Sequence, residues 1–205
     1  MAPEDLLQEL LERLPKLAVC REEIYRTFQA WIACFEEGGK LMICGNGGSQ
    51  ADSLHIVGEL MKGFERKRVV DSDFSDRLER MFPGEKLSGR LQAPLKALAL
   101  GVNPVLTTAV SNDVSPDMIF AQEVYGYGVC RDILFALSTS GNSRNVLNAV
   151  KVAKAMGIRC IGMAGGMGGE LKGLCDLCIV IPEKETGLIQ EYMLPIYHGL
   201  CRMVE

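Results

Sequence analysis

The sequence predicts an α/β fold built around a buried parallel β-sheet. Short apolar runs alternate with stretches of helical periodicity along most of the chain. The runs carry apolar residues at consecutive positions, which is typical of strands covered on both faces. Two of the runs pass directly into turns rich in glycine and serine, and a helical stretch follows each turn. Strands and helices that alternate in this way form parallel sheets with right-handed crossovers.

The N-terminal segment, residues 1–38, is predicted to be helical. Leucines recur every three or four residues in its first part, and Pro15 is expected to break or bend the helix. A second helix carries Trp31 and ends at Gly38 and Gly39. An amphipathic extension of this kind on a small α/β protein often packs against a partner subunit.

Five strands are expected in the remainder of the chain. They are predicted at residues 40–44, 95–100, 132–137, 159–163 and 177–181. Three further helices are expected to end at about Phe64, at Met156 and at Val204. Gly157 is a natural C-cap for the second of these helices.

Residues 65–94 interrupt this alternation. The segment is polar and charged, and only its residues 74–82 are predicted to form a short helix. Long loops inside compact domains are often functional. We interpret the segment as a loop inserted into a single domain that spans residues 1–205.

The composition excludes several classes of protein. Of 205 residues, 48% are apolar and 23% are charged, which suits a packed core and not a disordered chain. The 22 basic and 26 acidic residues give a net charge of −4, so no nucleic-acid partner is expected. No segment reaches the roughly 20 apolar residues that span a bilayer, and the acidic N-terminus does not resemble a signal peptide. We therefore expect a cytoplasmic protein without a membrane partner, whose cysteines are mostly buried thiols.

The first glycine-rich turn, residues 45–49, joins a predicted strand to a predicted helix. It is not a Walker A loop, because no lysine follows, and Gln50 stands where a dinucleotide fingerprint needs glycine. Its small residues would let a ligand approach the backbone N–H groups of the helix. The alternative is an ordinary turn in which Ser49 caps the helix and Asp52 completes a capping box.

The second turn consists of Ser138, Thr139, Ser140, Gly141, Asn142 and Ser143. Four hydroxyl groups gather where a helix begins, whereas capping needs only one. This composition favours a bound anion such as a phosphate group, held by hydroxyls, backbone N–H groups and the helix dipole. Ligands of open α/β sheets bind at the carboxyl ends of strands, where both turns are expected.

The chain has only two histidines, and both lie in helical stretches. His55 precedes Glu59 by four residues, so the two share one helix face. Gln190 and His198 are eight residues apart, about 80° beyond two full turns, and could face one cleft unless Pro195 shifts them. Two imidazoles, a carboxylate and an amide oxygen make a plausible zinc set. Without further support, ordinary core or surface histidines explain the same pattern.

Taken together and in this order, these motifs resemble the sugar isomerase (SIS) domain family, and most of all its phosphoheptose isomerase branch. The resemblance covers roughly residues 20–204. The matching motifs are the first turn, His55 with Glu59, Ser111-Asn112-Asp113, the second turn, Ile189-Gln190-Glu191, and His198. The resemblance implies a three-layer αβα sandwich with a five-stranded parallel sheet. It also implies a homotetramer with active sites at subunit interfaces.

The resemblance further implies roles for individual residues. The phosphate of a phosphorylated sugar would be held by Ser138, Thr139, Ser140 and Ser143. The rest of the substrate would contact Asn46, Gly47, Ser49, Asn112, Asp113 and Gln190. Zinc would be bound by His55, Glu59, Gln190 and His198. Glu59 and His198 match the acid/base pair of the family.

The implied reaction is the isomerisation of sedoheptulose 7-phosphate to glycero-manno-heptose 7-phosphate through an enediol. A carboxylate and an imidazole suit such proton transfers, and our hypothesis makes Glu59 the base and His198 the acid. The chain departs from the family at two places. Gly187-Leu188 replaces a polar or charged residue before Ile-Gln-Glu, and residues 65–94 replace a shorter link.

Two other functions compete with this one. One SIS branch associates with the bacterial replication initiator and keeps the fold as a scaffold without catalysis. A phosphosugar-sensing module would bind its ligand without turnover. The presence of Glu59 and both histidines favours the enzyme, because a scaffold has no chemical need for them.

Overall fold

The central sheet has five strands, and the computed structural model describes them within residues 1–205. The strands are β1 (Leu41–Cys44), β2 (Ala97–Ala99), β3 (Ile133–Leu137), β4 (Arg159–Gly165) and β5 (Leu177–Ile181). Their order is β2-β1-β3-β4-β5, and every neighbouring pair is parallel. The predicted α/β fold and its five strands are confirmed.

The strands are apolar at successive positions because both faces of the sheet are covered. In β1, Leu41 and Ile43 belong to one buried core, whereas Met42 and Cys44 belong to the other. Helices on both faces of a parallel sheet produce this pattern. The predicted αβα sandwich is therefore also confirmed.

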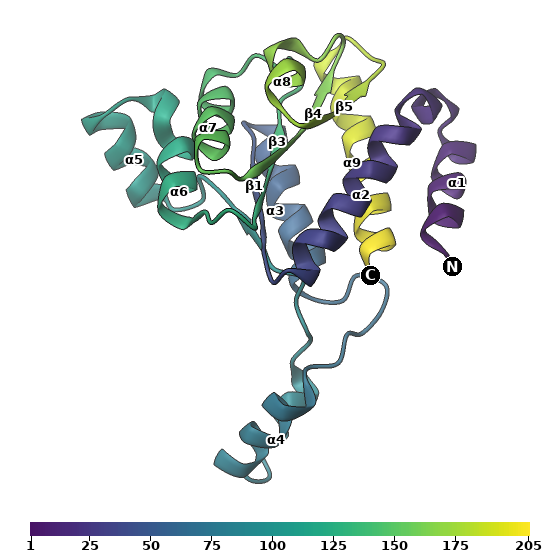
Figure 1. Ribbon diagram of the computed structural model, residues 1–205, viewed down its shortest axis with the longest axis vertical. Coiled ribbons are helices and arrows are strands. Elements are labelled where there is room, and N and C mark those ends of the chain that lie inside the picture. The colour runs from purple at the N-terminus through teal and green to yellow at the C-terminus, as the bar shows by residue number, and fades with distance from the viewer.

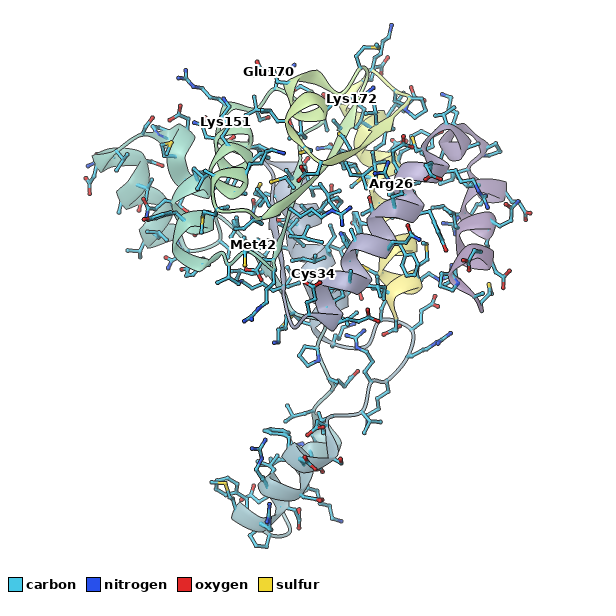
Figure 2. All side chains as sticks on the ribbon, viewed as in Figure 1. Arg26, Cys34, Met42, Lys151, Glu170 and Lys172 are labelled. Carbon is cyan, nitrogen blue, oxygen red and sulfur yellow. The ribbon has the colours of Figure 1, made fainter.

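The first helical layer packs on one face of the sheet (Figure 1). Its members are α1 (Pro3–Arg13), α2 (Arg21–Glu36), α3 (Gly48–Met61) and α9 (Thr186–Val204). Trp31 of α2 is fully buried and meets the Phe135 ring of β3 edge-on, with 5.2 Å between ring centroids. The side chains of this layer fill the space between helices and sheet (Figure 2).

The second layer covers the opposite face. It contains α6 (Ile119–Tyr127), α7 (Arg144–Ala155) and α8 (Gly169–Leu174), and α5 (Pro104–Asp113) lies at its outer edge (Figure 1). Helices α5 and α6 occupy a stretch for which the sequence analysis predicts no element.

The N-terminal segment breaks where proline predicts. Helix α1 ends at Arg13, a 3₁₀ helix spans Pro15–Cys20, and α2 follows directly. The apolar face of α1 is not left for another subunit, because its leucines are buried in the core that α9 shares.

Residues 65–94 form an arm that projects away from the body (Figures 1 and 2). Its helix α4 (Ser72–Met81) begins two residues before the predicted range and has no buried residue. The Asp71 side chain caps this helix by accepting a hydrogen bond from the Phe74 backbone N–H at 3.0 Å. The arm is therefore ordered locally by its own cap and turns.

All eight cysteines are free thiols, and only Cys130 is exposed. The expectation of mostly buried thiols is confirmed. None of the helices combines the length and the apolar character that crossing a bilayer requires.

Candidate active site

The two glycine- and serine-rich turns lie side by side. The strand order changes direction between β1 and β3, and helix α3 after β1 lies on one face while α7 after β3 lies on the other. Ligands bind at such a switch point in doubly wound sheets. The Asn46 and Asn145 amides bridge the turns with two reciprocal hydrogen bonds of 2.9 and 2.8 Å. The sequence analysis does not identify Asn145. The only indication of its role in the sequence is that it is an amide placed just after the second turn.

The first turn leaves the start of α3 without a side-chain cap. Its N-cap residue is Gly47, with φ of +55°, and no side chain accepts a hydrogen bond from the first N–H groups. The capping-box interpretation of Ser49 and Asp52 is wrong, because Ser49 lies inside the helix and Asp52 bonds to Tyr197. The N–H groups of Ser49 and Gln50 donate instead to the backbone carbonyls of Asn46 and Gly47, at 3.0 Å each, which leaves the Gly48 N–H group for a ligand.

The second turn spares its hydroxyl groups from capping as well. Ser143 is the N-cap residue of α7, yet its hydroxyl accepts from the Ser138 hydroxyl at 3.0 Å and does not bond to the helix N–H groups. The Ser140 hydroxyl accepts from the Asn142 N–H at 3.1 Å. Gly141 has φ of +67°, and a Cβ there would strike the backbone of residues 168 and 169. The turn is thus fixed by its backbone, with hydroxyls gathered at a helix N-terminus.

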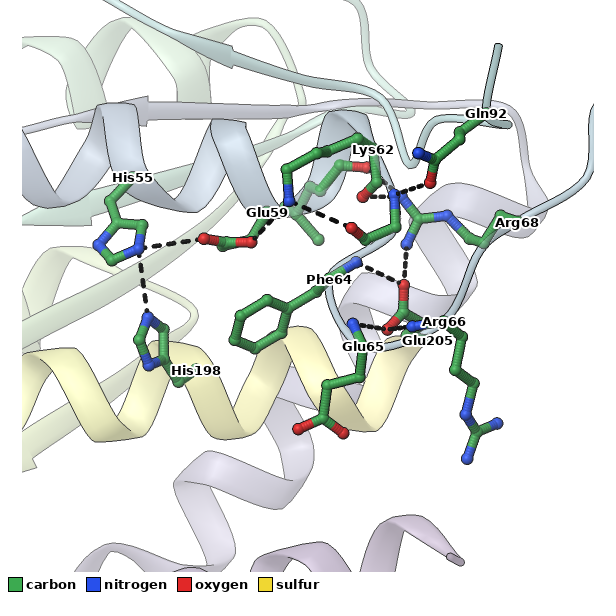
Figure 3. Close-up of polar contacts among 12 residues, drawn as sticks. His55, Glu59, Lys62, Phe64, Glu65, Arg66, Arg68, Gln92, His198 and Glu205 are labelled. Atoms are coloured by element: carbon green, nitrogen blue, oxygen red, sulfur yellow. Dashed lines mark hydrogen bonds and ion pairs between the residues drawn. The ribbon is translucent and has the colours of Figure 1, made fainter. Parts of the chain in front are cut away.

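A second cluster lies farther along α3, where His55 and Glu59 meet His198 of α9 (Figure 3). His55 Nε2 lies 3.1 Å from Glu59 Oε1 and 3.4 Å from His198 Nε2. Lys62 Nζ lies 3.3 Å from the other Glu59 oxygen. At 1.5 Å per residue, His55 is about 10 Å and Glu59 about 16 Å beyond Gly48 along the helix axis.

The charges of this cluster favour a neutral imidazole at His198. Burial lowers the pKa of His198 first, and the neighbouring His55 and Arg13 lower it further, while Glu59 acts in the opposite direction. A neutral imidazole keeps one lone pair and one N–H group. His198 also lines a pocket between α1 and α9 with Leu6, Glu9, Leu10, Arg13, Phe64, Glu65, Pro195, Gly199 and Arg202.

The cluster consists of imidazole and carboxylate groups, which are ligands that zinc prefers. Two of the distances between their nitrogen and oxygen atoms also suit a zinc ion. Zinc binds imidazole nitrogen and carboxylate oxygen at about 2.0–2.2 Å, so tetrahedral neighbours are about 3.3–3.6 Å apart. The two distances from His55 Nε2, 3.1 and 3.4 Å, are close to that edge length. The structure nevertheless contains no group of three or more His, Cys, Asp or Glu side chains placed so that they could hold a metal ion together.

The structure does not bring the remaining predicted residues to this cluster. The Gln190 amide lies over Gly48 at the start of α3, so it belongs with the turns. Asn112 and Asp113 lie exposed at the end of α5, and their side chains bond to each other at 2.8 Å. Gly187 and Leu188 are exposed in the first turn of α9.

The root of the arm is anchored beside the histidine cluster (Figure 3). The buried Glu205 carboxylate accepts hydrogen bonds from the N–H groups of Phe64, Glu65 and Arg66 and pairs with Arg68 at 2.9 Å. Arg68 also donates to the Leu60 carbonyl at the end of α3. Sequence reasoning missed this anchor, because nothing local links residue 205 to the insertion.

Fold and site together define a protein of the SIS domain class, and an SIS domain profile matches residues 87–165. The phosphoheptose isomerase of Rhodospirillum rubrum is 37% identical over 190 residues, covering 93% of this chain and 88% of the relative. That of Crocosphaera subtropica is 40% identical over 171 residues, covering 83% and 75%. The structure of a phosphoheptose isomerase from Francisella tularensis matches with a TM-score of 0.78 at 29% identity, covering 100% of this chain and 98% of that one. The chain belongs to the phosphoheptose isomerase family, which confirms the resemblance found in the motifs.

Proposed function

We propose that this chain is an aldose–ketose isomerase that converts sedoheptulose 7-phosphate into glycero-manno-heptose 7-phosphate. The observation that carries the proposal is the meeting of Glu59 with both histidines in a member of the phosphoheptose isomerase family. Helices α3 and α9 are far apart in the sequence, and a scaffold would have no need for these ionisable side chains at one point.

The second turn is the proposed phosphate site. Ser138, Thr139, Ser140 and Ser143 supply hydroxyl donors, and the uncapped start of α7 supplies backbone N–H groups and a positive dipole end. The first turn, with Asn46, Gly47 and Ser49, lies beside it and would contact sugar hydroxyls, together with Gln190. Asn112 and Asp113 are the substrate contacts with the least support, because their exposed side chains at the end of α5 bond to each other.

The proposed chemistry is a balanced internal proton transfer. Glu59 removes a proton from C1 of the ketose, which gives an enediol, and the protonated carboxyl returns a proton to C2. His198 supplies and accepts the oxygen-bound protons at C1 and C2. Carbon is both oxidised and reduced within one substrate, so no redox partner is needed. A positioned acid or base of this kind typically contributes 10²–10⁴-fold to the rate.

We also propose that zinc binds at the histidine cluster. His55, Glu59 and His198 supply two nitrogen donors and one oxygen donor. The prediction of Gln190 as the fourth ligand is not met within one chain, because its amide lies over Gly48 at the start of α3. A zinc ion held there would polarise the substrate carbonyl and stabilise the charge of the enediolate.

We further propose that the protein is a homotetramer with its active sites at subunit interfaces. The spacing along α3 supports this arrangement. The phosphate turn lies near the start of the helix, whereas Glu59 lies about 16 Å along it. Gln190 lies with the turns and His198 lies with Glu59. A neighbouring subunit could bring the turns of one chain to the histidine cluster of another.

Turnover of sedoheptulose 7-phosphate by the purified, zinc-loaded protein tests the proposed function. We expect turnover in the wild type and its loss in His198→Ala, while His198→Ala should unfold at a similar temperature. A folded, metal-bound wild type without turnover would favour another phosphosugar or the scaffold function. Turnover of His198→Ala near the wild-type rate would refute the acid role of His198.

A further inference from the structure

Tyr197 connects the histidine cluster to a carboxylate that the proposed chemistry does not use. The tyrosine is fully buried on α9, next to His198. Its hydroxyl lies 3.2 Å from Asp52 Oδ1 and 2.9 Å from His55 Nδ1. Asp52 and His55 lie on the same face of α3, three residues apart. The tyrosine oxygen is therefore shared between a carboxylate and an imidazole.

Only one proton is available on the tyrosine oxygen, and this limits the possible arrangements. An ionised Asp52 can only accept hydrogen bonds. If the hydroxyl donates to Asp52, its oxygen accepts from an Nδ1–H group of His55. If it donates instead to His55, the Asp52 and Tyr197 oxygens face each other at 3.2 Å without a proton between them. Both arrangements make one hydrogen bond to a carboxylate, because in the second the Nε2–H group of His55 donates to Glu59. The first is favoured, since Tyr197 is the only side chain that bonds to Asp52, whereas Glu59 also pairs with Lys62.

We propose that Asp52 and Tyr197 are positioning residues that hold the His55 proton on Nδ1 and so present the Nε2 lone pair to Glu59 and His198. His55 Nε2 then faces Glu59 Oε1 at 3.1 Å and His198 Nε2 at 3.4 Å, so acceptor atoms converge on one point. Such a point favours a divalent cation, and outer hydrogen bonds commonly fix the tautomer of a metal-binding histidine. The inference deepens the proposed zinc site and rests on it for the identity of the ligand.

Two hydrogen-bond acceptors compete for the single proton of a neutral His55. The Tyr197 oxygen lies at Nδ1, and the Glu59 carboxylate lies at Nε2. Without the tyrosine hydroxyl, Glu59 is the better remaining acceptor, and the proton moves to Nε2. A proton on Nε2 blocks the nitrogen that would bind the metal.

Imidazole ¹⁵N NMR of the metal-free protein tests the proposal directly. The chain has two histidines, so His198→Gln assigns both ring systems. We expect the neutral ring of wild-type His55 to carry its proton on Nδ1. Tyr197→Phe should move that proton to Nε2. Tyr192→Phe, on the same helix, is the matched control and should leave the His55 signals unchanged.

Zinc affinity, measured by competition with a chelator, is the second measurement. We expect Tyr197→Phe to weaken binding by about 10- to 100-fold, as is typical when an outer partner of a metal ligand is lost. Tyr192→Phe should bind as the wild type does. A wild-type His55 proton on Nε2, or a proton that stays on Nδ1 in Tyr197→Phe, would overturn the proposal. The wild-type spectrum decides even if Tyr197→Phe does not fold, and it needs neither metal nor substrate, so it is independent of the turnover assay.

Discussion

The two ends of α3 differ in chemistry although one short helix connects them. The groups at its start that face the turns are uncharged: backbone N–H groups, the hydroxyls of the second turn and the Asn46–Asn145 amide pair. Toward its end lie ionisable groups, with Glu59 between His55 and Lys62 and with Arg68 just beyond. The first end is suited to binding, and the second end is suited to moving protons.

The helix dipole explains part of this division. A helix N-terminus favours anions and a C-terminus favours cations. The uncapped start of α3 therefore suits a phosphorylated ligand, while Lys62 and Arg68 suit the end. Glu59 stands in the last turn of the helix, where a negative charge is disfavoured. It needs cationic neighbours there, which a bound metal ion would also provide.

The largest expected effect comes from Glu59→Gln at the end of the helix. This change keeps the shape of the side chain but removes the proposed base. We expect kcat to fall by about 10²–10⁴-fold, the usual contribution of a general base, with a smaller change in KM. Steady-state kinetics with sedoheptulose 7-phosphate measure both quantities.

Glu65→Gln is the matched control for this change, because Glu65 is a nearby carboxylate that pairs with Arg202 at 2.9 Å. It should retain nearly the wild-type kcat. If kcat fell equally in Glu59→Gln and Glu65→Gln, Glu59 would not be the base, and proton transfer would not distinguish the two ends of α3.

The end that binds was easier to predict from sequence than the end that reacts. Both turns are continuous motifs, so their residues could be identified before the structure was known. The motif order also pointed to His55, Glu59 and His198. Their distances could not be predicted, since α3 and α9 meet only through tertiary packing. The Tyr197–Asp52 contact could not be predicted for the same reason. The three-residue spacing between Ser49 and Asp52 matches a capping box and therefore suggested a different role for Asp52.

Arg68→Ala tests the contact between Arg68 and Glu205, which holds the root of the arm next to the C-terminal end of α3. Arg68 is 16% exposed and Glu205 2%, so removing the arginine leaves a buried carboxylate with one charged partner fewer. Breaking a buried pair in this way typically costs about 3–5 kcal/mol, and the three N–H donors to Glu205 place the expected value near about 3 kcal/mol. Urea denaturation measures it. Arg66→Ala, whose side chain is exposed, should change the stability by less than about 0.5 kcal/mol.

The same anchor predicts a dependence of stability on pH. Burial works to raise the pKa of Glu205, but the N–H groups of residues 64–66 and the charge of Arg68 outweigh it and hold the pKa below its ordinary value. A depressed carboxyl pKa stabilises the fold above the unfolded value, about 4.3, and this stability is lost as the pH falls through the folded pKa. The stability difference between wild type and Glu205→Gln should therefore shrink below about pH 4. A difference that stays constant down to pH 3 would contradict the assignment.

Ser138→Ala tests the second turn, which lies near the start of α3. There we expect a change in substrate binding and not in catalysis. The Ser138 hydroxyl donates to Ser143 in this structure and would turn its proton to a bound phosphate. Such a hydrogen bond to a charged group is worth about 1.5–3 kcal/mol, so KM should rise by roughly 10- to 100-fold while kcat stays near the wild-type value. Ser53→Ala is the control, because that hydroxyl bonds only to the Gln50 carbonyl within α3. A fall in kcat at unchanged KM in Ser138→Ala would remove the distinction between the two ends.

Asn145→Ala should give the smallest effect, because Asn145 is expected to act through Asn46 and not on the substrate. Its loss removes three neutral hydrogen bonds, two with Asn46 and one from the Val146 N–H group, and the exposed Asn46 can then bond to water. We expect KM to rise by about 3- to 10-fold, equivalent to roughly 0.6–1.4 kcal/mol, with kcat unchanged. Asn148→Ala, one turn further along α7, removes an amide that bonds to the Asp117 carbonyl and should leave KM unaltered. If both variants raise KM equally, the effect comes from α7 as a whole, and the amide bridge does not align the two turns.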